Sequence, residues 1–261
     1  MKDNSRFIFL LGGADLEMFT IRRLLDKGCY HYYDKHLRWD NACLSAYQNE
    51  IANCMKGNSF RWVGIELQED MDLPSNYIRI DHHNTNADKP SSLEQLADLL
   101  DISLNRWEQL VAANDKAYIP GMKALQASDT EISEIRQADR ACQGVTEIEE
   151  ILAEKAIREH IQVYNNLIVV RALCHRFSPI CDRLFPYERL LVFTDEEWMF
   201  YGKQAGRLVE IFQSDIQDGR IFYGGGPDGY IGCKRKVYTS SEIEQYIDLI
   251  KHLMTLVSTK N

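Results

Sequence analysis

A run of apolar residues from Phe7 to Leu11 stops at Gly12-Gly13, and this feature constrains the fold more than any other. A continuous apolar run that ends at glycines is typical of a strand buried on both faces, as in a parallel sheet. The next segment, 17–26, has apolar residues on one side and arginines opposite, which predicts an amphipathic helix. The chain therefore begins as a strand followed by a helix.

The same alternation continues to about residue 115. Further strands are predicted at 29–33, 60–67 and 77–80. Ser91 and Glu94 have the spacing of a capping box at the start of a helix. A second helix is predicted from about Leu104 to Ala113, ending at Asn114-Asp115. Strands that alternate with helices predict an α/β domain, Rossmann-like, with a mainly parallel sheet.

The rest of the chain has a different pattern. Strand signals are weak from 122 to about 177, so we predict a helical connector there. Short alternating segments and a glycine-rich turn then predict a small α+β domain at the C-terminus. The expected domains are 1–125 for the α/β domain, 126–182 for the connector and 183–261 for the C-terminal domain.

Composition excludes several classes of protein. The chain has 30 Lys and Arg against 39 Asp and Glu, a net charge of −9, which disfavours a long nucleic acid as partner. Seven cysteines without a CxxC pair indicate reduced thiols and a cytoplasmic location rather than a disulfide scaffold. No apolar stretch approaches the roughly 20 residues that span a bilayer, so no membrane is expected.

Acidic residues and histidines follow the predicted strands. Ligands bind at the carboxyl ends of strands in α/β sheets, so these side chains are expected to meet at one edge. Several carboxylates with a minority of imidazoles suit Mn²⁺ or Mg²⁺, in a site for up to two ions. The residues concerned are Asp15, Glu17, Glu66, Asp81, His82 and His83, together with Asp115 at the end of the second predicted helix.

One segment resembles a known family. Ile80-Asp81-His82-His83-Asn84-Thr85-Asn86, a short strand that leads into Asp-His-His, is similar to the signature of the DHH phosphoesterase superfamily. The resemblance implies an N-terminal Rossmann-like domain with the metal site, a helical connector and a smaller C-terminal domain that binds substrate. This order is similar to the organisation predicted above.

The resemblance implies a role for each matching residue. The first motif of the family has the form His-x-Asn-x-Asp-x-Asp. Asp15 matches its first Asp, Glu17 stands at its second, and Leu11 replaces its His. Glu66 matches the bridging Asp of the second motif, again as Glu, and Asp115 matches the Asp of the fourth.

Within Asp-His-His itself, the resemblance makes His82 a metal ligand. His83 would face the phosphate, and Asp81 would orient the ligands. The glycine-rich loop of the family, which binds substrate, corresponds to Gly224-Gly225-Gly226, here without the His that usually follows. Backbone amides of such a loop can hold phosphate oxygens.

Alternatives remain open at several of these positions. Asp34 or His36 could supply the ligand that is missing at Leu11. Glu17 could instead be an acid that complements a helix dipole, and Glu66 could belong to a solvated acidic turn. Gly224–Gly229 could be a simple hairpin turn, because Pro-Asp-Gly is a turn signal in its own right.

The resemblance favours a divalent-metal-dependent phosphoesterase or phosphatase. Its substrate would be a small phosphate ester or phosphoanhydride, such as a nucleotide, a dinucleotide or pyrophosphate. The alternative is a catalytically degenerate DHH-like protein that binds a nucleotide or a partner, which the replaced His and the two Glu positions motivate. A single-strand exonuclease ranks last because no basic stacking channel is evident. A homodimer is left open.

Overall fold

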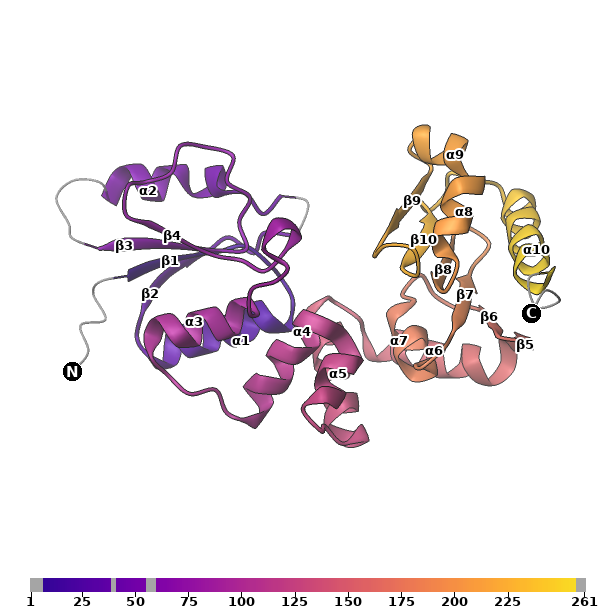
Figure 1. Cartoon of the computed structure of the whole chain (residues 1–261), viewed down its shortest axis with the longest axis horizontal. Helices are drawn as coiled ribbons and strands as arrows, with labels where there is room; N and C mark the ends of the chain where they lie inside the picture. The colour runs from indigo at the N-terminus through magenta and orange to yellow at the C-terminus, as the bar shows by residue number, and fades with distance from the viewer. Residues whose placement is uncertain (1–6, 39–40, 55–59, 257–261) are drawn as a thin grey trace. The chain divides into compact units, whose positions relative to one another are not determined.

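The computed structural model describes residues 7–38, 41–54 and 60–256. The chain divides into two compact units, Met1–Gly144 and Val145–Asn261, and each is considered by itself (Figure 1). The boundary between them falls inside the segment 126–182 that we predicted as a connector. Among the described residues, no helix has both the length and the apolar character that crossing a membrane requires.

The first unit is built on a parallel sheet with the strand order β2-β1-β3-β4, which confirms the α/β prediction. Helical segments follow its first, second and fourth strands, and a loop joins the third strand to the fourth. The described elements are β1 (Phe7–Leu11), α1 (Leu16–Lys27), β2 (His31–Asp34), the 3₁₀ turn η2 (Leu44–Tyr47), α2 (Gln48–Cys54), β3 (Arg61–Ile65), β4 (Tyr77–Ile80), η3 (Asn84–Asn86), α3 (Ser92–Leu100), α4 (Arg106–Ala124) and α5 (Asp129–Cys142).

The register of the parallel strands brings their carboxyl ends to one edge of the sheet. Leu11, at the end of β1, lies opposite Asp34 of β2 and Ile65 of β3. Ile65 in turn lies opposite Ile80, the last residue of β4. The segments that follow β1, β3 and β4 therefore start side by side, at the edge where ligands bind in sheets of this kind.

Apolar side chains hold this sheet between two layers. β1 and β3 are buried along almost their whole length, as expected for central parallel strands. On one face, Leu10 and Trp62 pack with Leu44, Tyr47 and Ile51 from the segment around α2. Figure 1 shows α1 and α3 on the opposite side of the sheet from α2. The strand ends are thus fixed from both sides.

The predicted start of α3 is confirmed. The side chain of Ser91 accepts a hydrogen bond from the Glu94 backbone, and the Glu94 carboxylate accepts one from the Ser91 backbone. Asn105 and Glu108 form the same reciprocal pair at the start of α4. Each capping box satisfies N–H groups that a helix leaves without a partner in its first turn.

Helix α4 does not end at Asn114-Asp115, and that part of the prediction is wrong. The helix runs on to a break at Ala117 and Tyr118, whose dihedral angles are not helical. Pro120 explains the break, because proline has no N–H to donate to the carbonyl four residues earlier and its ring clashes with that carbonyl. Tyr118 has a φ of 55°, a conformation that costs a residue other than glycine about 1–3 kcal/mol.

The second unit contains a mixed sheet with the order β5-β6-β7-β8-β10-β9, which confirms an α+β domain in this part of the chain. Trp198 and Phe200 of β8 form its core with Ile243 and Ile247 of α10. Its described elements are α6 (Glu147–His160), β5 (Ile161–Tyr164), β6 (Leu167–Arg171), α7 (Ser178–Leu184), β7 (Arg189–Phe193), β8 (Trp198–Gly202), α8 (Ala205–Ile211), α9 (Gln213–Gln217), β9 (Ile221–Gly224), β10 (Tyr230–Cys233) and α10 (Ser240–Leu256).

The middle of the chain is not helical throughout. Helices α5 and α6 are present, but the predicted connector also contains strands β5 and β6, so the prediction of helix over 161–171 is wrong. The two strands are joined by Asn165-Asn166, and Asn165 has a φ of 52°. Asparagine at positive φ in a two-residue loop is a hairpin signal.

Candidate metal centre

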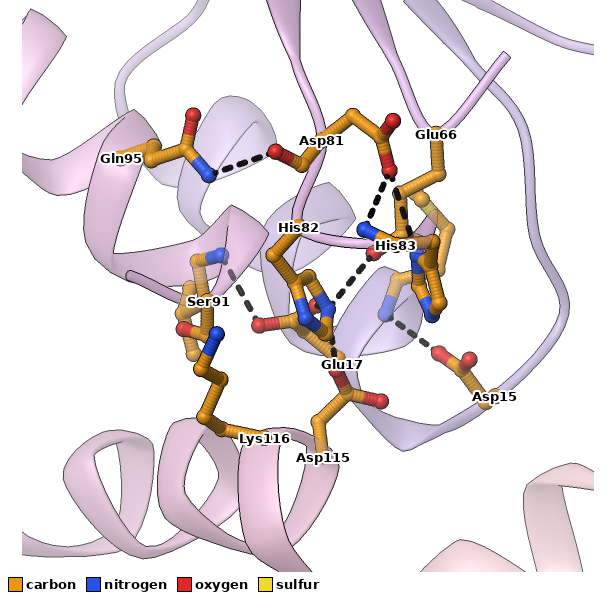
Figure 2. A network of polar contacts seen from close by, with 12 residues as sticks. Asp15, Glu17, Glu66, Asp81, His82, His83, Ser91, Gln95, Asp115 and Lys116 are labelled. Carbon is orange, nitrogen blue, oxygen red and sulfur yellow. Dashed lines mark hydrogen bonds and ion pairs between the residues drawn. The ribbon is translucent and has the colours of Figure 1, made fainter. Parts of the chain in front are cut away.

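Acidic residues and histidines from separate segments of the first unit gather beyond the carboxyl ends of the strands. Figure 2 shows them grouped around His82. They come from the start of α1, the residue after β3, the segment after β4, and the helix α4. In chain order they are Asp15, Glu17, Glu66, Asp81, His82, His83 and Asp115.

His82 lies at the middle of this group. Its Nε2 atom is 2.6 Å from Oδ2 of Asp115, 3.5 Å from Oε1 of Glu66 and 3.6 Å from Oε2 of Glu17. The side chain of His82 is only 5 % exposed, and those of Glu17 and Glu66 are fully buried or nearly so. One imidazole nitrogen is therefore surrounded by three carboxylates in a place that water hardly reaches.

Several atoms of this cluster have no hydrogen-bond partner. Although Nε2 of His82 is close to Asp115, the contact lacks the alignment that a hydrogen bond needs. Unpartnered buried polar atoms are costly, and a divalent cation among Glu66, His82 and Asp115 would give their free atoms a partner. The residues present therefore fit a metal ion. The atoms are Oε2 of Glu17, both carboxylate oxygens of Glu66, Nε2 of His82 and Oδ2 of Asp115.

The electrostatics of the cluster also suit a cation. Burial raises the pKa of Asp15 to about 8, and the nearby charge of Glu66 adds to this rise. Burial likewise raises the pKa of Glu17 and of Asp115. Burial alone would lower the pKa of His82, but its contacts with the carboxylates of the cluster outweigh this effect and raise the pKa to about 12. A metal ion would displace protons from such groups on binding.

Glu17 is held by the start of another helix. The backbone N–H of Leu93, in the first turn of α3, donates a hydrogen bond of 2.9 Å to Oε1 of Glu17. Such N–H groups have no partner inside their own helix. Because Oε1 is engaged, Oε2 is directed to His82. The extra methylene of Glu, compared with Asp, thus spans from α1 to the start of α3.

Glu66 stands where the backbone turns sharply out of β3. Its φ is 53°, and its N–H donates to the carbonyl of Ile80 at the end of β4. Gly12 packs directly against it: a Cβ atom on Gly12 would lie 2.4 Å from the carbonyl oxygen of Glu66. The strand end therefore bends sharply at Glu66, and Gly12 leaves the room for it.

His83 differs from His82 in its surroundings. Its side chain is 35 % exposed, and its Nδ1 lies 3.3 Å from Oδ1 of Asp81. The same Asp81 oxygen accepts a hydrogen bond from the His83 backbone, and its other oxygen accepts one from Asn86. Burial would raise the pKa of Asp81, but these hydrogen bonds hold it below its usual range. Asp81 thus orients His83 and lies beside the ligand cluster.

His83 was expected to face the phosphate. In the structure, however, a ring nitrogen of His83 belongs to a set of donor atoms that lie within 4.8 Å of one another. The other members of the set are Glu66, His82 and Asp115. Its place directly after His82 was the one signal in the sequence that could have indicated this proximity.

The position of the missing family histidine is apolar. Leu11 is completely buried at the end of β1. Asp34 lies opposite it in the register, but its carboxylate is 2.6 Å from Arg22 and also accepts from the backbone of His36. Among the described residues, neither Asp34 nor His36 belongs to the group of candidate ligands. An ion on this side of the site would have one donor fewer than the resemblance implies.

Gly224, Gly225 and Gly226 belong to the second unit. They end β9 and enter the loop to β10, so the hairpin that was left open as an alternative is what this segment forms. Gly225 and Gly226 both have positive φ, which glycine adopts at little cost. The loop also contacts the start of α8, where Gly206 N–H donates to Pro227. Phosphate binding by this loop stays a prediction.

No protein-family model matches the chain, and no curated protein matches it in sequence. Solved structures, in contrast, are similar to it in fold. A pGpG-specific phosphodiesterase, PggH from Vibrio cholerae, is 14 % identical with a TM-score of 0.47, over 95 % of this chain and 99 % of that one. The DHH domain of a member of a ribosomal protein family is 11 % identical with a TM-score of 0.48, over 96 % and 87 %. Both likenesses are in overall fold.

A third solved structure is more distant. RecJ from Thermus thermophilus, in complex with Mg²⁺, is 9 % identical with a TM-score of 0.40, over 94 % of this chain and 49 % of that one. All three TM-scores are below 0.5. The function of the chain therefore has to be argued from the contacts, burial and charges of its own side chains.

Proposed function

We propose that this chain is a divalent-metal-dependent phosphoesterase or phosphatase. Its substrate would be a small phosphate ester or phosphoanhydride, such as a nucleotide, a dinucleotide or pyrophosphate. One observation carries the proposal: carboxylates from three separate elements, two of them buried, converge on Nε2 of His82, with several oxygens unpartnered. Clustered acids of this kind are costly unless a cation binds among them.

Glu17, Glu66, His82 and Asp115 would hold the ion. Three carboxylates and one imidazole are hard ligands that suit Mn²⁺ or Mg²⁺. A divalent ion supplies the acidity that makes water a nucleophile near neutral pH, and it offsets charge on a phosphoryl group. Because Leu11 removes a donor, we expect one ion to bind tightly and a second, near Asp15, to bind weakly.

The remaining residues would act on the substrate. His83 is more accessible than His82, so it would donate a hydrogen bond to a phosphoryl oxygen as negative charge develops there. Asp81 would fix the orientation of the His83 ring through the contact at 3.3 Å. The backbone amides of Gly224, Gly225 and Gly226 would contribute further donors to phosphate.

Metal content and hydrolysis together test this function. The metal-free chain would be loaded with Mn²⁺, desalted and assayed for bound ions, beside His82→Ala. Both proteins would then be incubated with pyrophosphate, a nucleoside triphosphate and a linear dinucleotide. We expect the wild type to retain an ion and to hydrolyse at least one substrate, and His82→Ala to do neither.

The replaced histidine supports a second candidate function, that of a nucleotide- or partner-binding protein without turnover. Leu11 stands at a donor position, and no described residue takes its place in the cluster. Retention of metal without hydrolysis of any substrate would favour this candidate. A wild-type chain that retains no ion would overturn the metal-dependent proposal altogether.

A further inference from the structure

A buried polar cluster lies next to the candidate metal centre in the first unit, and the proposed mechanism does not use it. Asn114, Arg136 and Asp139 are each less than a tenth exposed. None of these three described residues is among the candidate ligands. A charged guanidinium is costly to bury unless its partners are well placed. The partners of Arg136 therefore indicate which segments of the fold it connects.

On one side Arg136 holds the helix that carries Asp115. Its Nη1 atom donates a hydrogen bond of 3.0 Å to Oδ1 of Asn114, the residue before Asp115. Its guanidinium carbon also lies 4.6 Å from the centre of the Tyr118 ring. Arg136 therefore contacts α4 on both sides of Ala117, where the helix begins to break, and touches the strained residue itself.

On the other side Arg136 reaches the start of α1. Its Nη1 atom lies 2.8 Å from Oδ2 of Asp139, one turn along the same helix. The second oxygen of Asp139 accepts a hydrogen bond of 3.3 Å from the backbone N–H of Leu16. Leu16 is the residue between Asp15 and Glu17. One guanidinium thus connects the segment that presents Asp115 with the segment that presents two further acids of the cluster.

We propose that Arg136 is a positioning residue for the metal centre, which holds Asp115 and the start of α1 at ligand distance through Asn114 and Asp139. This inference rests on the proposed function. The carboxylates of the cluster repel one another when no cation is present, so an external brace is needed to keep them together. Arginine suits this role because its planar group is always charged and can bind two partners in fixed directions.

The chain offers a matched control. Arg106 also links α4 to α5, through Glu131 at 2.9 Å, but on the surface and without contact to a neighbour of a candidate ligand. Arg106→Met and Arg136→Met therefore remove the same chemical group from the same pair of helices. Only the second removes contacts that lead to the acidic cluster.

The test is a titration of the full-length metal-free chain with Co²⁺, whose visible absorption depends on the geometry of its ligands. We expect Arg136→Met to weaken Co²⁺ binding by about 10- to 100-fold, as loss of a residue behind metal ligands typically does, and to change the spectrum. Arg106→Met should leave both unchanged. Arg136→Lys keeps the charge without the planar fork, and should restore part of the affinity.

The outcomes separate this role from the proposed function. A wild-type chain that binds no Co²⁺ would overturn both. A wild-type chain that binds Co²⁺, with Arg136→Met equal to it in affinity and spectrum, would overturn the positioning role alone, even if the variant melts at a lower temperature. If Arg136→Met does not fold, Arg136→Lys and Asp139→Asn take its place in the titration. Weaker Co²⁺ binding by these two variants would support the positioning role, and unaltered binding would overturn it.

Discussion

His82 and His83 are neighbours in the chain, with ring centres 4.2 Å apart, yet they occupy different environments. The side chain of His82 is 5 % exposed and touches acids from three other segments, whereas that of His83 is 35 % exposed and contacts Asp81. The two imidazoles can therefore have different functions. Burial favours metal binding at His82, and access to solvent favours substrate binding at His83.

This contrast predicts different losses in two alanine variants. His82→Ala should lose the bound ion, because it removes the nitrogen that the three carboxylates share. His83→Ala should keep the ion and lower kcat/KM by about 10²- to 10⁴-fold, the usual effect of losing a group that assists proton transfer or charge stabilisation. Bound Mn²⁺ after desalting and steady-state hydrolysis, measured on both proteins, check the prediction. Equal loss of metal in the two variants would make His83 a ligand instead.

Glu66→Gln should change stability in opposite directions with and without metal. Both carboxylate oxygens of Glu66 are buried and unpartnered beside other acids. Removing the charge should therefore raise the free energy of unfolding of the metal-free chain. In the wild type, Mn²⁺ at 100 times its Kd should add about 2.7 kcal/mol. The variant should lose most of this gain. Urea unfolding with EDTA and with Mn²⁺ measures both quantities.

The matched control for that experiment is Glu69→Gln, three residues along. Glu69 pairs with Arg79 and is not among the candidate ligands. Its substitution should leave the gain from Mn²⁺ intact and should not stabilise the metal-free chain. A Glu66→Gln protein that is less stable than the wild type in EDTA would show that repulsion does not dominate at this site.

Much of the candidate site could be predicted from the sequence, because parallel strands present their carboxyl ends at one edge. An apolar run followed by a polar residue marks each such end, as Ile65-Glu66 and Ile80-Asp81 do. Asp115 was placed at the end of the second predicted helix, where it also matched the fourth DHH motif. Its helix, however, continues beyond the predicted end, because α4 breaks only where Pro120 disfavours it.

Other features depend on contacts between distant residues and leave little trace in the sequence. The hydrogen bond from Leu93 to Glu17 and the buried Arg136 are of this kind. The strands at 161–164 and 167–171 were missed for a different reason. Short apolar runs fit a helix as well as a strand. In this segment the Asn165-Asn166 turn is the sequence signal that favours two strands.

Gly12→Ala should disturb the candidate site through the backbone. The new Cβ would lie 2.4 Å from the carbonyl oxygen of Glu66, and backbone at this distance must shift. Overpacking of this kind typically costs about 1–3 kcal/mol, and the displaced Glu66 should weaken metal binding. Gly13→Ala is the milder comparison for stability, because its nearest atom is Oε2 of Glu66 at 3.3 Å, the end of a side chain that can move, rather than backbone. An equal loss of stability in both variants would contradict the prediction.

The contacts of Glu131 at the start of α5 should make part of the free energy of unfolding depend on pH. Glu131 accepts hydrogen bonds from Arg106 and from the backbone and hydroxyl of Ser128, and these contacts, with Arg106 first, lower its pKa from 4.5 to about 2. A lowered pKa stabilises the fold above about pH 4.5, and this contribution is lost as the pH falls towards 2. Wild type should therefore exceed Glu131→Gln in free energy of unfolding at pH 7, with the difference shrinking between pH 4.5 and 2. Arg106→Met should remove most of the same pH dependence, and urea unfolding across this range measures it. A difference that stays constant with pH would mean that the capping geometry, and not the charge, supplies the stability.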